Sequence, residues 1–434
     1  MFGTSGIRGP VGEDVTAALA LSVGRAVGVD ADRVVVGRDP RESGRLLTDA
    51  LTAGLRELGT DVVDVGCAAT PTVARAVAWE DADAGVSVTA SHNPASDNGL
   101  KLWEPSGKAF GPTRREAVAE RVRADDHDLH GWDGLGTRTA AGAGDRHVQA
   151  LVDAVSVPTE PSVVVDLGNG AGGVTVDALT GLGCDVETLN AQPDGSFPGR
   201  PSEPTAANCT SLATLVGESD ADLGIAHDGD ADRMRAVTAD GTFLSGDVTL
   251  ALFAAAAADR GERVAVPVDT SLAVEDFLAE RGVATTRTPV GDVHVAEAAT
   301  ADDVAFGGEP SGAWIWPVET LCPDGPLAAC RLVELHAERS IEDRVAAIPT
   351  YPIRRESVAV EDKAAVMTRV REAVADRYDD VATLDGVRVD LGDAWFLLRA
   401  SGTQPLVRVT AEAREADRAD AVFQKASDLL AACR

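Results

Sequence analysis

Val34-Val35-Val36-Gly37-Arg38-Asp39 is a short β-branched run that ends in an aspartate, and two later stretches repeat this pattern. The repeats are Val163–Asp166 and Val264–Asp269. A helix-length stretch and a glycine follow each run, and a second strand-like run begins after the glycine. The glycines are Gly59, Gly183 and Gly282, and the second strands are expected at about 61–65, 184–189 and 283–288. Strand, helix and strand in this order predict a crossover connection and a parallel sheet in each repeat.

Each repeat then has another apolar strand that leads directly into a polar loop. Ala84–Val88 precedes Ser91, Asp222–Ala226 precedes Asp228, and Asp303–Phe306 precedes Glu309. Ligands of parallel α/β sheets bind beyond the carboxyl ends of the strands. These three loops are therefore the places where we expect the chemistry of the protein.

The chain after about residue 350 departs from this plan. Its helix-like and strand-like segments are expected at 361–378, 387–391, 395–399 and 407–411, with a closing helix that ends near 432. This order favours a smaller α+β domain. A length of 434 residues is also typical of three or four domains. We predict three similar α/β domains with mixed, mostly parallel sheets at 1–140, 141–243 and 244–349, and an α+β domain at 350–434.

The composition excludes some classes of protein. The net charge is −31, from 70 acidic and 39 basic residues, so a basic surface for nucleic acid is not expected. The acidic excess and the presence of only four lysines suggest adaptation to high salt, where such charge is screened. The chain opens without a basic and apolar leader, and it contains no apolar run long enough for a membrane span. The six cysteines are scattered, which favours reduced thiols and a cytoplasmic protein.

Asp228, Asp230 and Asp232 alternate just after an apolar strand in the stretch Asp228-Gly229-Asp230-Ala231-Asp232-Arg233. Three carboxylates this close repel one another unless a cation joins them. Oxygen ligands of this kind favour Mg²⁺, with a fourth anionic oxygen supplied from elsewhere. A solvated acidic turn is the alternative, because the whole chain is acidic.

Ser91, in Thr89-Ala90-Ser91-His92-Asn93-Pro94, is the candidate source of that oxygen, as a serine that carries a phosphoryl group. A helix cap or a turn is its ordinary alternative role. Lys101 follows ten residues later and is the candidate proton shuttle, although it could also be a surface lysine. Arg8 lies between glycines that let an anion approach the backbone closely.

Gly168-Asn169-Gly170-Ala171-Gly172-Gly173 satisfies the dinucleotide-binding pattern G-x-G-x-x-G. Because it follows a strand of the second repeat, we interpret it as a tight turn between strand and helix. Nucleotide binding is the alternative.

Two further loops carry polar groups suited to a sugar phosphate. The stretch Arg399-Ala400-Ser401-Gly402-Thr403 offers a guanidinium, hydroxyls and backbone N–H groups to a phosphate, and Arg408 adds a second guanidinium. Glu309 and Ser311, in a glycine-bounded loop, offer an acceptor and a hydroxyl to sugar hydroxyls. Ordinary turns are the alternative for both loops.

These motifs, in this order and with Gly6-Ile7-Arg8-Gly9 near the start, resemble the alpha-D-phosphohexomutase family along the whole chain. The resemblance implies four domains around a central cleft, with Ser91 as a phosphoserine whose oxygen joins Asp228, Asp230 and Asp232 around Mg²⁺. It assigns acid/base work to Lys101, helped by Arg8 and His92, and places Arg233 near the substrate. The remaining matched positions bind sugar or the distal phosphate: Glu309, Ser311, Arg399, Ser401, Gly402 and Thr403.

The implied reaction moves a phosphate between C1 and C6 of a hexose through phospho-Ser91 and a hexose 1,6-bisphosphate. The substrates are small sugar phosphates, and the protein is expected to be a monomer or a homodimer. The opening resembles archaeal phosphoglucosamine and phosphomannose mutases, which favours glucosamine phosphate over mannose or glucose phosphate. Ala313, where many members have His, and Gln404, where Glu is usual, depart from the family pattern. A Mg²⁺-dependent phosphatase that uses Ser91 and a non-catalytic sugar-phosphate or nucleotide binder are the rival hypotheses.

Overall fold

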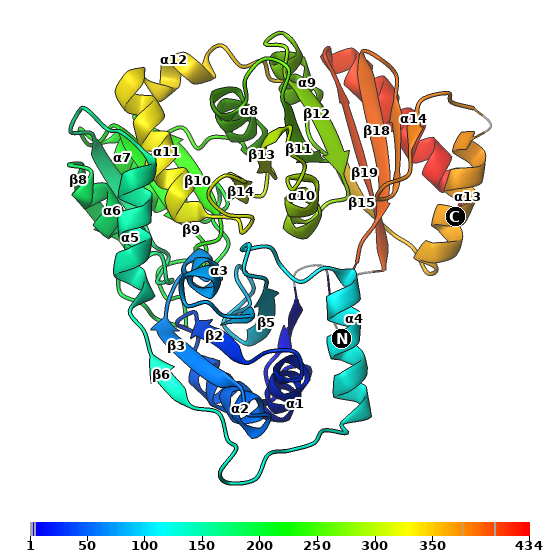
Figure 1. Ribbon diagram of the computed structural model, residues 1–434. Coiled ribbons are helices and arrows are strands. Elements are labelled where there is room, and N and C mark those ends of the chain that lie inside the picture. The colour runs from blue at the N-terminus through cyan, green and yellow to red at the C-terminus, as the bar shows by residue number, and fades with distance from the viewer. Residues whose placement is uncertain (1–2, 4–5, 376, 403–404) are drawn as a thin grey trace. The chain divides into compact units, whose positions relative to one another are not determined.

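The computed structural model describes residues 3, 6–375, 377–402 and 405–434, and the chain forms two compact units (Figure 1). The first unit comprises Met1–Thr249 and Ser311–Arg344. The second comprises Leu250–Pro310 and Val345–Arg434. Within the described part of the chain, every helix is too short or too polar to cross a membrane.

The first unit begins with a six-stranded sheet in the order β1-β5-β4-β2-β3-β6. The strands are β1 (Ile7–Pro10), β2 (Arg33–Arg38), β3 (Asp61–Cys67), β4 (Ala84–Val88), β5 (Asp97–Trp103) and β6 (Arg138–Ala140). Strands β4, β2, β3 and β6 run parallel, whereas β5 is antiparallel to both β4 and β1. The predicted strand–helix–strand crossover is therefore confirmed, and the antiparallel pairs of β5 make the sheet mixed and mostly parallel, as predicted.

The alternation of valines along β2 explains why this sheet is buried on both faces. Val34 and Val36 belong to one apolar core and Val35 to another. Helices α1 (Ala17–Gly28) and α2 (Gly44–Glu57) pack side by side on the first face, and α3 (Thr70–Trp79) packs on β2 and β4 (Figure 1). Gly24 and Gly54 permit the close contact of α1 with α2, because a Cβ atom at either position would lie 2.2 or 2.1 Å from a carbonyl oxygen of the other helix. Helix α4 (Pro112–Ala124) packs against α1.

The second sheet of this unit has the order β10-β9-β7-β8, with β9 parallel to β7 and antiparallel to β10. Its strands are β7 (Ser162–Asp166), β8 (Asp185–Leu189), β9 (Leu223–His227) and β10 (Met234–Thr238). The helices around it are α5 (Ala143–Ala154), α6 (Gly173–Gly181), α7 (Thr210–Gly217) and α11 (Gly325–Glu338). Three elements between residues 244 and 349 lie outside the strand–helix–strand pattern of the third repeat. They are helix α8 (Gly246–Ala257), strand β14 (Trp314–Ile315) and helix α12 (Ile341–Val345).

The second unit contains the third repeat, in which β11 pairs in parallel with both β12 and β13. The elements are β11 (Arg263–Pro267), α9 (Leu272–Ala279), β12 (Ala284–Thr288), α10 (Asp292–Ala298) and β13 (Val304–Gly308). Gly59, Gly183 and Gly282, the predicted stops of the three crossover helices, all have positive φ angles of 77–87°. Only glycine adopts this conformation without strain, so the same local signal ends the helix in each repeat.

The remainder of the second unit is an antiparallel sheet in the order β15-β19-β18-β17-β16. Its strands are β15 (Ile353–Ala359), β16 (Val381–Ala382), β17 (Val387–Asp390), β18 (Ala394–Ala400) and β19 (Leu406–Ala413). Helices α13 (Lys363–Ala375) and α14 (Ala416–Ala432) share an apolar core with it. The predicted α+β domain is confirmed, while β15 was not anticipated; the domain limits at 140, 243 and 349 stay predictions.

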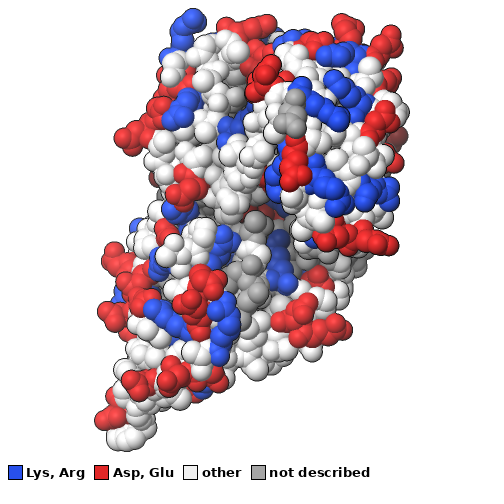
Figure 2. Space-filling view, turned by 90° about the vertical axis from the view of Figure 1, so that its right-hand side faces the viewer, with Lys and Arg blue, Asp and Glu red and all other residues white. Residues whose placement is uncertain are grey.

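Acidic side chains are scattered over the face shown in Figure 2, and arginine and lysine side chains lie among them. On this face the acidic excess is therefore not gathered into a single patch.

Candidate functional site

Ser91 lies in the loop between β4 and β5 and is buried. Its backbone adopts the left-handed conformation, with φ at +53°, and its N–H group donates to Thr89 Oγ1 at 2.8 Å. The hydroxyl donates to Asp228 Oδ2 at 2.6 Å, and His92 Nδ1 lies 3.4 Å from the same oxygen. The predicted nucleophile is thus in direct contact with the predicted metal loop.

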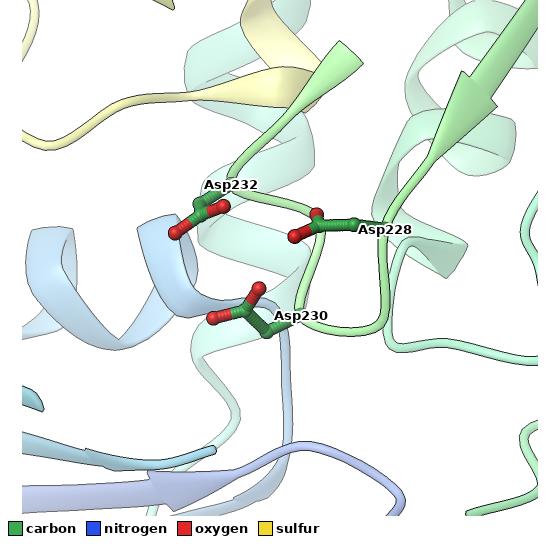
Figure 3. Close-up of side chains that lie close together, drawn as sticks. All are labelled: Asp228, Asp230 and Asp232. Atoms are coloured by element: carbon green, nitrogen blue, oxygen red, sulfur yellow. The ribbon is translucent and has the colours of Figure 1, made fainter. Parts of the chain in front are cut away.

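The carboxylates of Asp228, Asp230 and Asp232 follow β9 and point toward one another (Figure 3). All three are buried, and one oxygen of each lies within 4.8 Å of the others. Thr70, at the start of α3, fixes Asp230 by donating its hydroxyl to Oδ2 at 2.7 Å and its N–H to the backbone oxygen at 2.8 Å. Asp230 Oδ1 is buried and has no hydrogen-bond partner within the described structure. The arrangement can hold a metal ion, as the sequence predicted.

The three aspartates do not share one electrostatic environment. Burial, reinforced by the charges of Asp232 and Asp230, raises the pKa of Asp228 well above its ordinary value. Burial acts on Asp230 in the same direction, but Lys101 and Thr70 outweigh it and hold the pKa of Asp230 below its usual range. A divalent cation would remove the repulsion that raises the pKa of Asp228.

Lys101 lies on β5, and its ammonium group donates to Asp230 Oδ2 at 3.0 Å and to Asp232. Arg8 lies on β1 opposite Gly99 of β5, so the antiparallel pairing brings these two predicted residues to one edge of the sheet. The Nε atom of Arg8 is buried without a hydrogen-bond partner among the described residues. The candidate proton shuttle and the candidate anion-binding arginine thus share the neighbourhood of the carboxylates.

His92 is held neutral by its surroundings. Burial, together with the positive charges of Arg233, Arg8 and Lys101, lowers its pKa to about 2. Because the Ser91 hydroxyl already donates to Asp228, the neutral imidazole can only donate an Nδ1–H to the same oxygen, and it carries no second proton at physiological pH.

Arg233 and the second half of the predicted sugar loop are neighbours in the first unit. The N–H group of Met234 donates to the carbonyl of Gly312 at 3.0 Å, and Arg233 forms a β-bridge with Ala313. Ser311, which precedes Gly312, therefore lies close to the metal loop. The sequence did not predict this pairing, because a motif does not indicate which distant backbone segment it will pair with.

In the second unit, the turn Val290-Gly291 links the first half of the sugar loop to the phosphate loop. Gly291 N–H donates to Glu309 Oε1 at 2.6 Å, and Val290 N–H donates to Asp385 Oδ2 at 3.2 Å. The same Asp385 oxygen accepts from Arg399 Nη1 at 3.0 Å. Three hydrogen bonds thus connect Glu309 to Arg399, through residues that the sequence motifs did not indicate.

The rest of the predicted phosphate loop follows β18. The Nζ atom of Lys363, at the start of α13, donates to the carbonyls of Ser401 and Gly402, so an ammonium group that the sequence did not predict lies beside the loop. Arg408 is exposed and is the register partner of Arg399 on the neighbouring strand. Thr403 and Gln404 lie outside the described residues.

The glycine-rich loop at 168–173 packs against the metal loop. The N–H group of Ala171 donates to the carbonyl of Gly229 at 3.0 Å, and a Cβ atom on Gly170 would lie 2.8 Å from that oxygen. The glycine is needed for contact with protein backbone, which supports its interpretation as a strand-to-helix turn.

Arg41 is a buried residue at this site that no motif indicated. Its guanidinium pairs with Asp39 at 2.9 Å and donates to the carbonyls of Ser91, Asn93, Pro94 and Asp97 at distances of 2.5–2.8 Å. One buried cation therefore holds four carbonyls of the Ser91 loop. The reason it was missed is that backbone acceptors leave no sequence signature.

Asp39 gives this arrangement a dependence on pH. Burial raises its pKa to about 6, although Arg41 and Thr89 act in the opposite direction. The folded state therefore binds a proton on Asp39 more tightly than the unfolded state does. The stability that this protonation contributes is fully present below about pH 4 and is lost as the pH rises through about 6. We expect the unfolding free energy of Asp39→Asn to rise by about 2 kcal/mol relative to that of the wild type as the pH increases from 4 to 7.

Chemical unfolding at constant salt measures this difference, with the exposed Asp133→Asn as the matched control. A difference between Asp39→Asn and the wild type that stays constant over this pH range would contradict the assignment.

Comparison with known proteins gives four matches in the order expected for one family. They are the phosphoglucomutase/phosphomannomutase alpha/beta/alpha domains I, II and III at residues 1–128, 145–241 and 245–351, and the C-terminal domain at 357–429. Two archaeal relatives are each described as a "probable phosphoglucosamine mutase". The one from Methanopyrus kandleri is 45% identical and covers 100% of this chain and 98% of its own. The one from Methanococcoides burtonii is 43% identical and covers 99% of this chain and 98% of its own.

Solved structures agree with these matches. A phosphoglucomutase/phosphomannomutase family protein from Burkholderia thailandensis has a TM-score of 0.90 at 28% identity and covers 100% of this chain and 98% of its own. The N-acetylphosphoglucosamine mutase of Aspergillus fumigatus, solved with GlcNAc-6P and magnesium, shares the fold with a TM-score of 0.61 at 16% identity, covering 100% and 95%. The chain belongs to the phosphoglucomutase/phosphomannomutase family, the alpha-D-phosphohexomutases that its four motifs resemble.

Proposed function

We propose that the protein is a phosphohexomutase, an isomerase that interconverts hexose 1-phosphate and hexose 6-phosphate through phospho-Ser91 and a hexose 1,6-bisphosphate. The contact of Ser91 Oγ with Asp228 Oδ2, at 2.6 Å within a buried cluster of three carboxylates, carries this proposal. The archaeal relatives described as phosphoglucosamine mutases favour glucosamine phosphate as the substrate. Mannose and glucose phosphates are the alternatives.

The carboxylates fit a Mg²⁺ ion. Asp228, Asp230 and Asp232 offer the hard oxygen ligands this ion prefers, and Asp230 Oδ1 is a buried acceptor with no hydrogen-bond partner within the described structure. These residues and a phosphate oxygen on Ser91 would hold the ion. When bound, it neutralises the charge that develops on the transferred phosphoryl group.

In the first half of the reaction, the bond between phosphorus and Ser91 Oγ breaks while a bond to the free sugar hydroxyl forms. We assign the proton transfer to Lys101, whose ammonium group donates to Asp230 and Asp232: it gives a proton to the Ser91 oxygen and then takes the proton that the sugar hydroxyl loses. Neutral His92 can donate its Nδ1–H to the serine oxygen. The second half reverses these roles and returns the other phosphate of the bisphosphate to Ser91.

A mutase also needs groups that hold the phosphate and sugar that are not reacting. We assign sugar hydroxyls to Glu309 and Ser311, and the distal phosphate to Arg399, Ser401, Gly402, Thr403 and Arg408. Lys363 adds a positive charge beside the carbonyls of Ser401 and Gly402. Arg233 and Arg8 supply the positive charge of the reacting end.

We also propose that a hexose 1,6-bisphosphate acts as primer, and that the protein is cytoplasmic and is a monomer or a homodimer. None of the six cysteines, all of which are described, forms a disulfide, and this is typical of proteins from a reducing compartment.

A product assay tests the proposed function. The protein is incubated with Mg²⁺, a hexose bisphosphate primer and molar KCl, and with glucosamine, N-acetylglucosamine, mannose or glucose 1-phosphate. We expect the corresponding 6-phosphate, with kcat/KM at least about 10-fold higher for glucosamine 1-phosphate, a discrimination worth about 1.4 kcal/mol. Release of inorganic phosphate in place of the 6-phosphate would favour the phosphatase.

A further inference from the structure

Ser202 joins the nucleophile loop to the metal loop through two backbone groups. Its hydroxyl donates to the carbonyl oxygen of Ser91 at 2.7 Å and accepts from the N–H group of Gly229 at 3.0 Å. The side chain is buried, with 3% of the residue exposed. One hydroxyl therefore bridges the residue that carries the phosphoryl group and the residue between Asp228 and Asp230.

The carbonyl of Ser91 is held from two sides. Arg41 Nη2 donates to it at 2.8 Å, in addition to the bond from Ser202. Both lone pairs of this oxygen are thus used, and the backbone of Ser91 is in the left-handed conformation at φ +53°. A residue other than glycine keeps this conformation only where its surroundings hold it.

Gly229 packs closely against Ser202 and against the backbone of Ser91. A Cβ atom at Gly229 would lie 2.7 Å from Ser202 Oγ, 2.9 Å from the carbonyl of Ser91 and 3.1 Å from the ring of Phe197. The segment that supplies Ser202 also packs on Arg41. A Cβ atom on Gly195 would lie 2.4 Å from the Arg41 Cα, and the Arg41 guanidinium lies 5.0 Å from the centroid of the Phe197 ring.

Residues 195–202 therefore form a connection that touches both loops and the arginine that holds one of them. We propose that Ser202 is a positioning residue for phosphoryl transfer, which sets the distance between Ser91 and the aspartate loop. The inference deepens the proposed function and depends on it. Ser202 is not a catalytic residue, because its contacts are with backbone groups of the two loops.

Loss of this hydroxyl removes one bond to each loop and leaves the rest of the site in place. Misplacement of a reacting group by about 1 Å costs on the order of 10²-fold in rate. We therefore expect Ser202→Ala to lower kcat by about 10- to 100-fold, while KM changes by less than about 3-fold, because no substrate-binding group is touched. Single-turnover transfer from phospho-Ser91 should slow by the same factor as kcat.

Ser196→Ala is the matched control, since Ser196 lies in the same segment, is exposed and bonds only to Asp194 within the described structure. It should retain full activity. Ser202→Thr keeps a hydroxyl that can donate and accept, and it should recover activity relative to Ser202→Ala. If Ser202→Ala does not fold, Ser202→Cys preserves the side-chain volume with a weak hydrogen-bonding group and allows the same comparison.

A folded Ser202→Ala protein with kcat within 2-fold of the wild type would overturn the positioning role. An equal loss in Ser202→Thr and Ser202→Ala would also overturn it. A wild-type protein without mutase activity would instead refute the proposed function, so the two failures are distinguishable.

Discussion

Replacement of Ser91 by alanine is expected to lower kcat by about 10⁴-fold or more, because it removes the atom that carries the phosphoryl group. The Ser91 hydroxyl is buried and donates to Asp228 Oδ2 at 2.6 Å, directly beside the carboxylates of the candidate metal site. The residual rate should be close to that of a sample without enzyme. A coupled assay for the sugar 6-phosphate measures the change.

Ser96→Ala is the control for this variant, because Ser96 lies in the same loop and its hydroxyl contacts only Asp97 within the described structure. It should keep normal activity. Mass spectrometry after incubation with hexose bisphosphate should find one phosphate on the peptide that contains Ser91, and none in Ser91→Ala. Normal turnover by Ser91→Ala would rule out both the mutase and the serine-dependent phosphatase.

Replacement of Asp230 by asparagine should give the second largest effect, a loss of at least about 10²-fold in both Mg²⁺ affinity and kcat. Asp230 has one buried oxygen without a hydrogen-bond partner in the described structure and another that is held by Thr70 and Lys101. An amide at this position keeps the size of the side chain but removes the negative charge. The loss should therefore appear in the binding of the metal itself, and calorimetric titration with Mg²⁺ or Mn²⁺ measures it without substrate.

Asp220→Asn, at an exposed position of the same domain, is the control for charge and should bind the metal normally. If Asp230→Asn bound Mg²⁺ with unchanged affinity, the three aspartates would be a structural cluster and not a metal site.

The sequence predicted the elements whose signals are local. Short β-branched runs, helix-length stretches and glycine stops recur in all three repeats, and Gly59, Gly183 and Gly282 have the positive φ angles that such stops require. The polar loops at the strand ends followed from the same repeat. The contact of Ser91 with Asp228 agrees with the site that was predicted from them.

Features that depend on pairing between distant segments could not be predicted in this way. Strand β5 contains Gly99, which weakens a strand signal but is needed here, since a Cβ atom would lie 2.1 Å from the carbonyl of Ile7 and 2.8 Å from that of Thr89. The convergence of Arg8 and Lys101 depends on this antiparallel pairing.

The residues that hold the loops were missed for a related reason. Arg41 and Ser202 reach the carbonyl of Ser91 across 50 and 111 residues of sequence. Backbone carbonyls exist at every position, so their recognition leaves no motif for a sequence to reveal.

The phosphoryl group on Ser91 is the proposed intermediate in the transfer between the two ends of the sugar. Enzyme labelled with ³²P on Ser91, mixed with excess glucosamine 1-phosphate and Mg²⁺ in a rapid-quench experiment, tests it most directly. We expect the label to appear in glucosamine 1,6-bisphosphate or the 6-phosphate at a rate no slower than kcat. Label that leaves as inorganic phosphate, or that leaves more slowly than kcat, would contradict it.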